Sequence, residues 1–313
     1  MHKRYCFSNV LGIFIFNEHF KVIKKELFAN NEQYLGSVEK KNSLMKQFNA
    51  IEPEGKSLVR ILGIFADGSY DRAFVERNIA LAKLHVKESV SEDNLIIQSV
   101  SSLMELTTVT NTLLKRLREW YGMYNPETER AVEEQETFVS EIIAKDRKAL
   151  LGRLKINEKD SMGGDISKKD VDAVLMLAKQ IEHLRSFRSK QEQYLEGLMT
   201  TYCPNITALA GSFLGAKLIH QAGSLKQLVE FPASTVQVLG AEKALFRHMK
   251  TGARAPRHGY IAQHPLLASA QQEMHGKIAR SLADKILLCA KVDYFKGEFI
   301  GSTLLKELER KFK

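Results

Sequence analysis

The stretch AGSLKQLVEFPASTVQVLGAEKALFRHMKTGARAPRHGYIAQHP, from Ala222 to Pro265, decides the interpretation of the fold. Glycine and proline punctuate it closely, and short amphipathic runs lie between them. This pattern is typical of short helices joined by tight turns. The punctuation already begins near Tyr202, so we expect residues 201–313 to form a compact all-helical domain. Residues 299–313 should form its last helix, starting near Ser302 and Thr303.

The charged side chains in the middle of this stretch are all cationic. Between Lys243 and His258 there is no Asp or Glu. On a helix, Lys243, Arg247 and Lys250 have the spacing i, i+4 and i+7 and therefore share one face. We expect the opposite face to point toward a core through Val238, Leu245 and Met249.

An exposed basic loop should follow this helix. Gly252 and Pro256 are residues that end helices, so the helix should stop there. The loop beyond it carries Arg254, Arg257 and His258. Two interpretations of the cations stay open. Cations near a helix C-terminus complement the helix dipole and face water, whereas guanidinium groups also fork onto phosphates and stack on RNA bases.

The middle of the chain, residues 91–200, has long charged and apolar patterns without strand signals. Asp93–Tyr121 predicts one long helix that ends before Pro126. Two further helical stretches, Glu127–Leu154 and Lys168–Thr200, flank a loop around Gly163 and together predict a helical hairpin.

The second stretch of this hairpin has a heptad-like apolar pattern, and its members are Val171, Val174, Ala178 and Ile181. At 1.5 Å per residue this stretch extends about 50 Å. We expect an intramolecular antiparallel coiled coil, and self-association through its tip is the alternative.

The first 90 residues predict a small α/β unit. Val10–Phe16 and Leu58–Phe65 are short apolar runs with β-branched or aromatic residues, which favour strands. Asp67–Gly68 is a turn signal after the second run. Apolar residues then recur at helical spacing from Phe74 to Val86, so a helix should close the unit.

Composition narrows the class of protein. The 313 residues carry 46 Lys and Arg against 37 Asp and Glu, a net charge of +9, which suits a polyanionic partner without proving one. The three cysteines form no CxxC pair, so a reducing, cytoplasmic location is expected. Neither a signal-peptide cleavage site nor a run of about 20 apolar residues is present, so no membrane association is expected.

The stretch from Ala222 to Pro265 resembles the central signature of the Nop-domain family, which includes the archaeal scaffold proteins of box C/D RNA-guided methylation particles. The resemblance extends to four other motifs: LREWYG at Leu117–Gly122, DSMGGDIS at Asp160–Ser167, PNITALAG at Pro204–Gly211 and GKIARSLADKILLCAKVDYF at Gly276–Phe295. About two thirds of the chain is covered. Lysine-rich repeats typical of many eukaryotic relatives are missing after Phe299, which favours an archaeal-type protein.

The resemblance implies a mainly α protein with three parts. Residues 1–90 would be an α/β domain that docks a fibrillarin-type methyltransferase, and residues 91–200 a coiled-coil arm for self-association as a homodimer. Residues 201–313 would be an all-α Nop domain that binds box C/D guide RNA together with a ribosomal-protein-like kink-turn-binding protein. Carried over by motif, ten residues would form this RNA- and partner-binding surface: Gly240, Ala241, Glu242, Lys243, Arg247, His248, Lys250, Arg254, Arg257 and His258.

No constellation of catalytic residues is recognisable. Methyl transfer from S-adenosylmethionine needs a nucleotide-binding turn after a strand, and no GxGxxG-like motif is present. His258 and His264 lack a third metal ligand nearby, so neither a metal nor another cofactor is expected. The predicted function is therefore that of a non-enzymatic scaffold for 2′-O-methylation of rRNA or tRNA. The alternative is a spliceosomal-type Nop-domain protein that binds kink-turn RNA without a methyltransferase.

Overall fold

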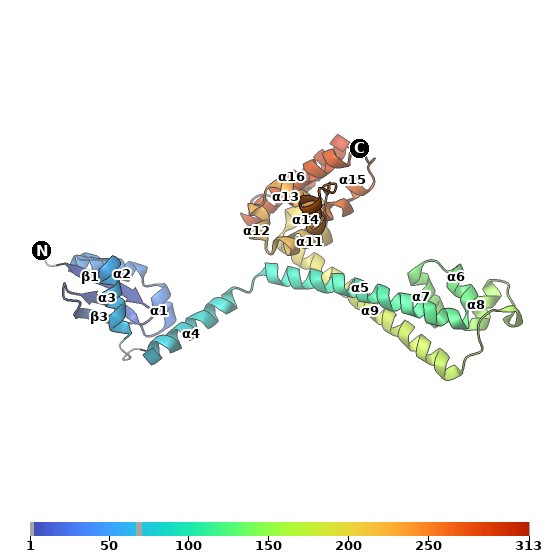
Figure 1. Cartoon of the computed structure of the whole chain (residues 1–313), viewed down its shortest axis with the longest axis horizontal. Helices are drawn as coiled ribbons and strands as arrows, with labels where there is room; N and C mark the ends of the chain where they lie inside the picture. Colours follow the sequence, from blue (N-terminus) through green and yellow to red (C-terminus); the bar gives the residue numbers. More distant parts are fainter. Residues whose placement is uncertain (1–2, 67–70, 313) are drawn as a thin grey trace. The chain divides into compact units, whose positions relative to one another are not determined.

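The computed structural model describes residues 3–66 and 71–312, and the chain divides into two compact units, Met1–Ser91 and Glu92–Lys313. The predicted fold class, mainly α with a small N-terminal α/β part, is confirmed (Figure 1). The second unit contains both the predicted arm and the predicted helical domain. Their assignment as separate functional domains stays a prediction.

The first unit is built on a four-stranded sheet of order β3-β2-β1-β4. Its strands are β1 (Arg4–Asn9), β2 (Gly12–Phe16), β3 (Val22–Leu27) and β4 (Ala50–Ile51). β1 pairs antiparallel with β2 and parallel with β4, and β3 pairs antiparallel with β2. The strand predicted at Val10–Phe16 is confirmed as β2, all of whose residues are buried.

Successive side chains of β2 enter two different cores, because side chains alternate between the faces of a sheet. Ile13 and Ile15 pack in one cluster with Leu44 of α2 (Val38–Phe48). Phe14 and Phe16 pack in the other with residues of α3 (Gly55–Phe65). The sheet therefore lies between α2 and α3, and the other helices of the unit are α1 (Asn31–Leu35) and α4 (Asp71–Glu88).

The strand predicted at Leu58–Phe65 is wrong, because these residues form most of α3. A short apolar run does not by itself distinguish a buried strand from a helix. Here Glu54 and Ser57 form a capping box that starts a helix, and Ile61 alone in this helix is fully buried. The turn predicted at Asp67–Gly68 lies outside the described residues. The closing helix predicted from Phe74 to Val86 is confirmed as α4.

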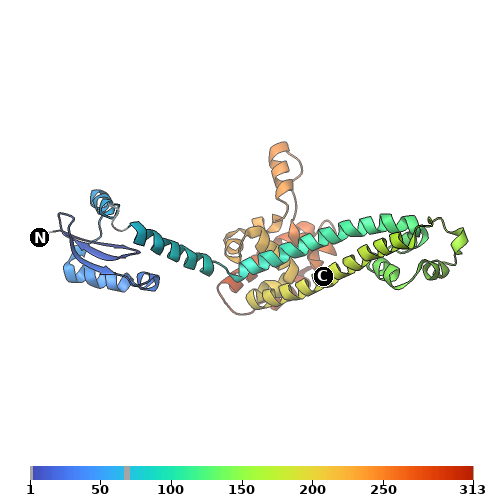
Figure 2. The same cartoon turned by 90° about the horizontal axis from the view of Figure 1, so that it is seen from below.

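Two long helices, α5 (Glu92–Tyr124) and α9 (Lys168–Tyr202), lie side by side and form the arm of the second unit (Figures 1 and 2). α5 confirms the predicted helix. The predicted hairpin of Glu127–Leu154 with Lys168–Thr200 is wrong, because the long helix that packs along α9 is α5. Residues 126–153 instead form three short helices: α6 (Pro126–Ala131), α7 (Gln135–Ala144) and α8 (Arg147–Arg153).

Capping residues explain why residues 126–153 do not form one helix. The side chain of Asn125 accepts a hydrogen bond from the Thr128 N–H, and Pro126 occupies the first turn of α6. The side chain of Asp146 accepts one from the Ala149 N–H and starts α8. These capping residues divide residues 126–153 into short helices, although apolar periodicity alone predicts one continuous helix there.

The three short helices give the end of the arm a core of its own. Phe138 and Ile142 of α7 and Leu150 of α8 pack against Leu117 of α5 and Ile181 of α9. The heptad residues Val174 and Ala178 are buried in the same cluster. Packing within one chain therefore accounts for these heptad positions. Self-association through the arm stays a prediction.

The rest of the unit is a helical domain. Its helices are α10 (Pro204–Ala210), α11 (Ser212–Ala222), α12 (Leu225–Glu230), α13 (Ala233–Val238), α14 (Glu242–Thr251), α15 (Pro265–Ala268), α16 (His275–Tyr294) and α17 (Gly301–Phe312). The domain also contains the 3-10 helix η2 (Tyr260–Gln263), whereas the 3-10 helix η1 (Glu158–Asp160) lies in the loop before α9. The last helix starts at Gly301, one residue before the predicted Ser302. The domain core also includes Leu195 and Met199 of α9, so the arm and the domain share a helix.

A buried carboxylate joins three helices of this domain. Asp293 of α16 accepts hydrogen bonds from the Asn205 N–H at 3.0 Å, the Asn205 side-chain amide at 2.7 Å and the Ile206 N–H at 2.9 Å. The side-chain oxygen of Asn205 accepts in turn from the N–H groups of Ile300 and Gly301. Asp293 and Asn205 thus supply acceptors at the starts of α10 and α17, where helices leave N–H groups unpaired.

Candidate RNA and partner interface

The predicted site residues lie on a segment that we call the protrusion, residues 240–258. Its base is closed by three hydrogen bonds: Gly259 N–H to Gln237 O at 2.9 Å, Tyr260 N–H to Leu239 O at 2.7 Å, and Gln237 side-chain amide to Arg257 O at 2.7 Å. The chain therefore leaves and re-enters the domain at neighbouring points. In Figure 2, α14, drawn in orange, stands away from the other helices of its unit.

α14 contains no buried residue. The prediction that Val238, Leu245 and Met249 point together toward a core is therefore wrong. Val238 ends α13 and belongs to a different helix, Leu245 is only half-buried, and Met249 is 64% exposed. The sequence pattern of α14 is amphipathic, but the turn at Gly240 directs the helix away from the domain.

The five cationic side chains of the protrusion are all exposed: Lys243, Arg247, Lys250, Arg254 and Arg257. In the part of the chain that the structure describes, none of the five forms an ion pair. Gly252 ends α14 in the left-handed conformation, with φ of 68°, as predicted from its residue type. The structure thus presents three cations on a helix and two on the loop that follows it, and none of them has a carboxylate partner among the described residues.

Gly240 and Glu242 shape the turn that starts α14. The Gly240 N–H donates to Glu242 Oε1 at 2.7 Å, and the turn holds Gly240 at φ of 87°. A Cβ at this position would lie 2.6 Å from the ring of Tyr260. Packing against Tyr260 therefore accounts for the small residue at Gly240. Ala241 is half-buried in the same turn.

The histidines of this region have structural contacts. His248 Nδ1 contacts the carbonyl oxygen of Ala253 and closes the C-terminal end of α14. His258 is half-buried and its ring centroid lies 5.8 Å from that of His275. Burial lowers the pKa of His258, and the neighbouring His275 lowers it further. His258 is therefore a neutral contact at the base of the protrusion at physiological pH.

His264 is buried away from the protrusion. Its Nε2 lies 2.9 Å from the Leu209 carbonyl oxygen, and its Nδ1 accepts from the Leu266 N–H at 3.2 Å. It caps α15 and links it to α10. Among the described residues there is no group of three His, Cys, Asp or Glu side chains arranged to hold a metal ion.

Sequence reasoning missed an apolar stripe on α14. Phe246 is 57% exposed and lies three residues before the exposed Met249, so both are on one side of the helix. This stripe runs beside the face that carries Lys243 and Lys250. The sequence shows both apolar residues, but their spacing alone does not distinguish a face that packs on a core from a face that is exposed.

Lys217 is a further cation near the base of the protrusion that the sequence did not reveal. Its Nζ lies 4.3 Å from the ring centroid of Phe213 and 5.7 Å from that of Tyr260, and donates to Gln263 Oε1 at 3.0 Å. Burial lowers the pKa of Lys217. Only the packing of α11 against η2 brings this lysine close to Tyr260, which lies 43 positions later in the chain (260 minus 217).

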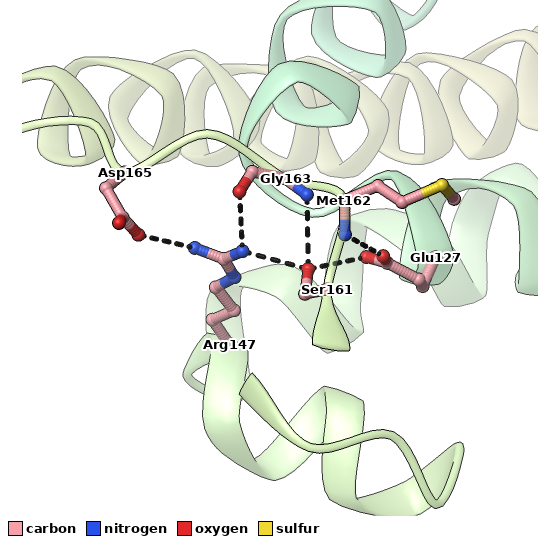
Figure 3. A network of polar contacts seen from close by, with 6 residues as sticks. All are labelled: Glu127, Arg147, Ser161, Met162, Gly163 and Asp165. Atoms are coloured by element: carbon pink, nitrogen blue, oxygen red, sulfur yellow. Dashed lines mark hydrogen bonds and ion pairs between the residues drawn. The ribbon is translucent and has the colours of Figure 1, made fainter. Parts of the chain in front are cut away.

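The DSMGGDIS motif forms an ordered loop at the end of the arm (Figure 3). Glu127 accepts hydrogen bonds from the Met162 N–H at 2.6 Å and the Ser161 hydroxyl at 2.9 Å. Arg147 donates to Ser161 Oγ and to the Gly163 carbonyl oxygen, and lies 3.6 Å from Asp165. Burial alone would raise the pKa of Glu127, but these hydrogen bonds outweigh it and lower the pKa.

The same loop packs against the C-terminal end of α5. A Cβ on Gly163 would lie 2.0 Å from the Tyr124 carbonyl oxygen, so only glycine fits there. The guanidinium of Arg147 lies 4.9 Å from the centre of the Tyr124 ring. The loop predicted around Gly163 is thus fixed to the arm, and it leaves the side chain of Met162 exposed.

Fold and site define a helical protein of two units that presents a polybasic protrusion. In the described residues, no helix has the length and apolar character needed to cross a bilayer. A family model described as "Nop: snoRNA binding domain, fibrillarin" matches residues 102–313. The chain therefore belongs to the Nop family.

Several known proteins are similar to the chain. An uncharacterized NOP5 family protein of Methanocaldococcus jannaschii is 40% identical over 70% of this chain and 56% of its own length. Nucleolar protein 58 of Schizosaccharomyces pombe is 39% identical over 64% and 42%, and nucleolar protein 56 of Saccharomyces cerevisiae 35% identical over 78% and 53%. The chain thus spans about half the length of these relatives. A solved structure described as a fibrillarin/Nop5p complex matches with a TM-score of 0.47 and 26% identity over 98% of both chains.

Proposed function

We propose that the chain is the scaffold subunit of a box C/D guide-RNA ribonucleoprotein. In this proposal it bridges kink-turn RNA and its ribosomal-protein-like binding protein to a fibrillarin-type methyltransferase, which performs 2′-O-methylation of rRNA or tRNA. The observation that carries the proposal is the protrusion, with five exposed cations and no carboxylate partner among the described residues, in a chain of the Nop family. A surface of this kind favours a phosphate backbone.

The two stripes of α14 suit a composite partner. The cationic face of Lys243, Arg247 and Lys250 matches the phosphates of an RNA. The neighbouring Phe246 and Met249 are exposed and apolar, and such side chains contribute binding energy where a protein surface or a base removes them from water. We therefore infer that the RNA and the kink-turn-binding protein contact α14 together, and that the ten predicted residues contribute unequally.

Those residues divide by their contacts into two groups. The exposed Lys243, Arg247, Lys250, Arg254 and Arg257 are proposed to contact RNA directly. Gly240, Ala241, Glu242, His248 and His258 are proposed to act indirectly, because they hold the turn, the C-terminal end and the base of the protrusion.

We further propose a division of labour between the two units. Residues 1–90 are the candidate docking domain for the methyltransferase, and the arm is the candidate surface for self-association. The scaffold itself is proposed to perform no catalysis, so the methyl donor site belongs to the partner enzyme. The separate packing of the first unit supports this division.

Reconstituted guided methylation tests the proposal. The full chain, a kink-turn-binding protein, a fibrillarin-type enzyme and a box C/D guide RNA should together methylate the guided nucleotide, and omission of the chain should abolish the reaction. Removal of residues 1–90 should abolish methylation and leave RNA binding nearly unchanged. Full methylation by the truncated chain would contradict the docking assignment. RNA binding without methylation in the complete mixture would favour the spliceosomal-type alternative.

A further inference from the structure

The direction of the protrusion is decided at its base. α14 contains no buried residue, so its own side chains add nothing to the domain core. The chain leaves the domain at Leu239 and returns at Tyr260, whose N–H donates to the Leu239 carbonyl oxygen at 2.7 Å. A Cβ added at Gly259 would lie 1.9 Å from the same oxygen, so the two segments are in close contact there. The contacts at this closure therefore determine how firmly α14 is held.

Gly240, the first residue of the protrusion, packs against the ring of Tyr260. A Cβ added at Gly240 would lie 2.6 Å from Cδ2 and 2.7 Å from both Cε2 and Cγ of that ring. Nearly equal distances to three adjacent ring atoms mean that this Cβ would point at the face of the ring. The turn that starts α14 and the ring of Tyr260 are therefore in direct contact, and the contact leaves no room for a larger residue at position 240.

The side chain of Tyr260 is held in turn by α11. Its hydroxyl donates to Gln221 Oε1 at 3.3 Å. Lys217 Nζ lies 5.7 Å from its ring centroid, which is within the range of a cation–π interaction. Lys217 and Gln221 are four residues apart and therefore share one face of α11. Because α11 also carries the buried core residues Leu218 and Ile219, the ring is attached to a helix of the domain core.

These contacts connect the core to the protrusion: α11 holds the ring of Tyr260, and the ring supports the turn at Gly240 from which α14 starts. We propose that Tyr260 is a positioning residue, which fixes the direction in which α14 leaves the domain so that the RNA and the kink-turn-binding protein meet a preorganised surface. This inference rests on the proposed function of the protrusion. Without the ring, α14 takes several directions in the free chain and is ordered only on binding, which lowers affinity.

Distances within the RNA-free full chain test the positioning directly. Spin labels at M249C on α14 and E230C on α12 report the separation of the two helices by pulsed electron paramagnetic resonance. The native cysteines are buried and stay in place: Cys6, Cys203 and Cys289.

The distance distribution should be narrow in the wild type and in Y260F, which keeps the ring, and broader or shifted in Y260A. G240A perturbs the same contact from the other side, because its Cβ would meet the ring, and should also change the distribution. The matched control is I261A, which changes a fully buried residue of the same 3-10 helix, η2. It removes core packing rather than the support of the turn, so it should leave the distribution unchanged.

Filter binding of a kink-turn RNA with its binding protein, using the unlabelled full chain, measures the consequence for RNA binding. Y260A should weaken binding about tenfold or more, because the protrusion is no longer preorganised. The slope of log affinity against log salt should change by less than the loss of one phosphate contact, which is about 0.7 to 0.9. R247A/R254A should lower that slope. I261A should keep the wild-type RNA affinity at a temperature where chemical denaturation shows every variant folded.

The proposal is overturned if Y260A keeps either the distance distribution or the RNA affinity of the wild type. It is also overturned if I261A lowers the RNA affinity as much as Y260A does, because loss of stability alone would then explain both effects. If R247A/R254A binds RNA as the wild type does, the proposed function of the protrusion fails. The distances measured without RNA then still decide whether Tyr260 positions α14.

Discussion

The salt dependence of RNA binding gives the sharpest check on the protrusion. The double variant R247A/R254A removes one cation from α14 and one from the loop. α14 has no buried residue and Arg254 is exposed, so neither change disturbs the core. Alanine also favours the helix. A change in RNA affinity then reports the contacts of the two guanidinium groups.

The magnitude follows from the number of exposed cations. If all five contact phosphates, log affinity should fall with log salt with a slope of about −3.5 to −4.5, at about 0.7 to 0.9 per contact. Three remaining contacts give a slope of about −2.1 to −2.7. Between about 50 and 200 mM salt, the wild type should lose affinity about 130- to 500-fold and the variant about 18- to 42-fold.

Filter binding of a kink-turn RNA, in the presence of its binding protein, measures both slopes. The matched control is R72A/R116A, which removes the same charge at two exposed positions outside the protrusion. Its slope should equal that of the wild type. If the control and R247A/R254A have the same slope, the protrusion does not contact phosphates and net charge alone explains RNA binding.

Three further predictions concern stability and assembly. D293A should lower the free energy of unfolding by about 3 to 6 kcal/mol, because it leaves buried donors of Asn205 and Ile206 without an acceptor. Chemical denaturation measures this free energy. The prediction is contradicted if D293A has no larger effect than D284N, which changes an exposed position of the same helix. Burial raises the pKa of Asp93, although hydrogen bonds from the Leu225 N–H and Tyr202 oppose the shift. The folded state therefore disfavours the ionised carboxyl, so as the pH rises from the unfolded value of about 3.9 through the folded pKa, wild type should lose stability relative to D93N. Thermal melts from acid to neutral pH that show the opposite trend would refute this. Replacing residues 113–183 with a short linker removes the core at the end of the arm but keeps Leu195 and Met199 of the domain core. Light scattering should then find a folded chain of lower oligomeric state. An unchanged number of chains per particle would reject self-association through the arm.

The sequence predicts helix positions best where the helical spacing of apolar residues continues over many turns. α5 and α9 were predicted nearly to their ends, because their apolar residues keep helical spacing over many turns. β2 was predicted because a short run of large apolar residues suits a strand buried on both faces. At Leu58–Phe65 the same kind of run forms α3, and a local capping box made the difference.

For the candidate site, the sequence by itself determined the density and spacing of the cations from Lys243 to Arg257, and the turn residues Gly240 and Gly252 on either side of α14. It did not determine which way the helix faces. Amphipathic periodicity shows that two faces differ, but only packing decides whether the apolar face meets a core. The tertiary structure directs α14 away from the domain, and this exposes Phe246 and Met249. It also decided the contacts between distant segments, including Lys217 with Tyr260 and Glu127 with Met162. Such contacts depend on how helices pack, and nothing in the local sequence encodes that arrangement.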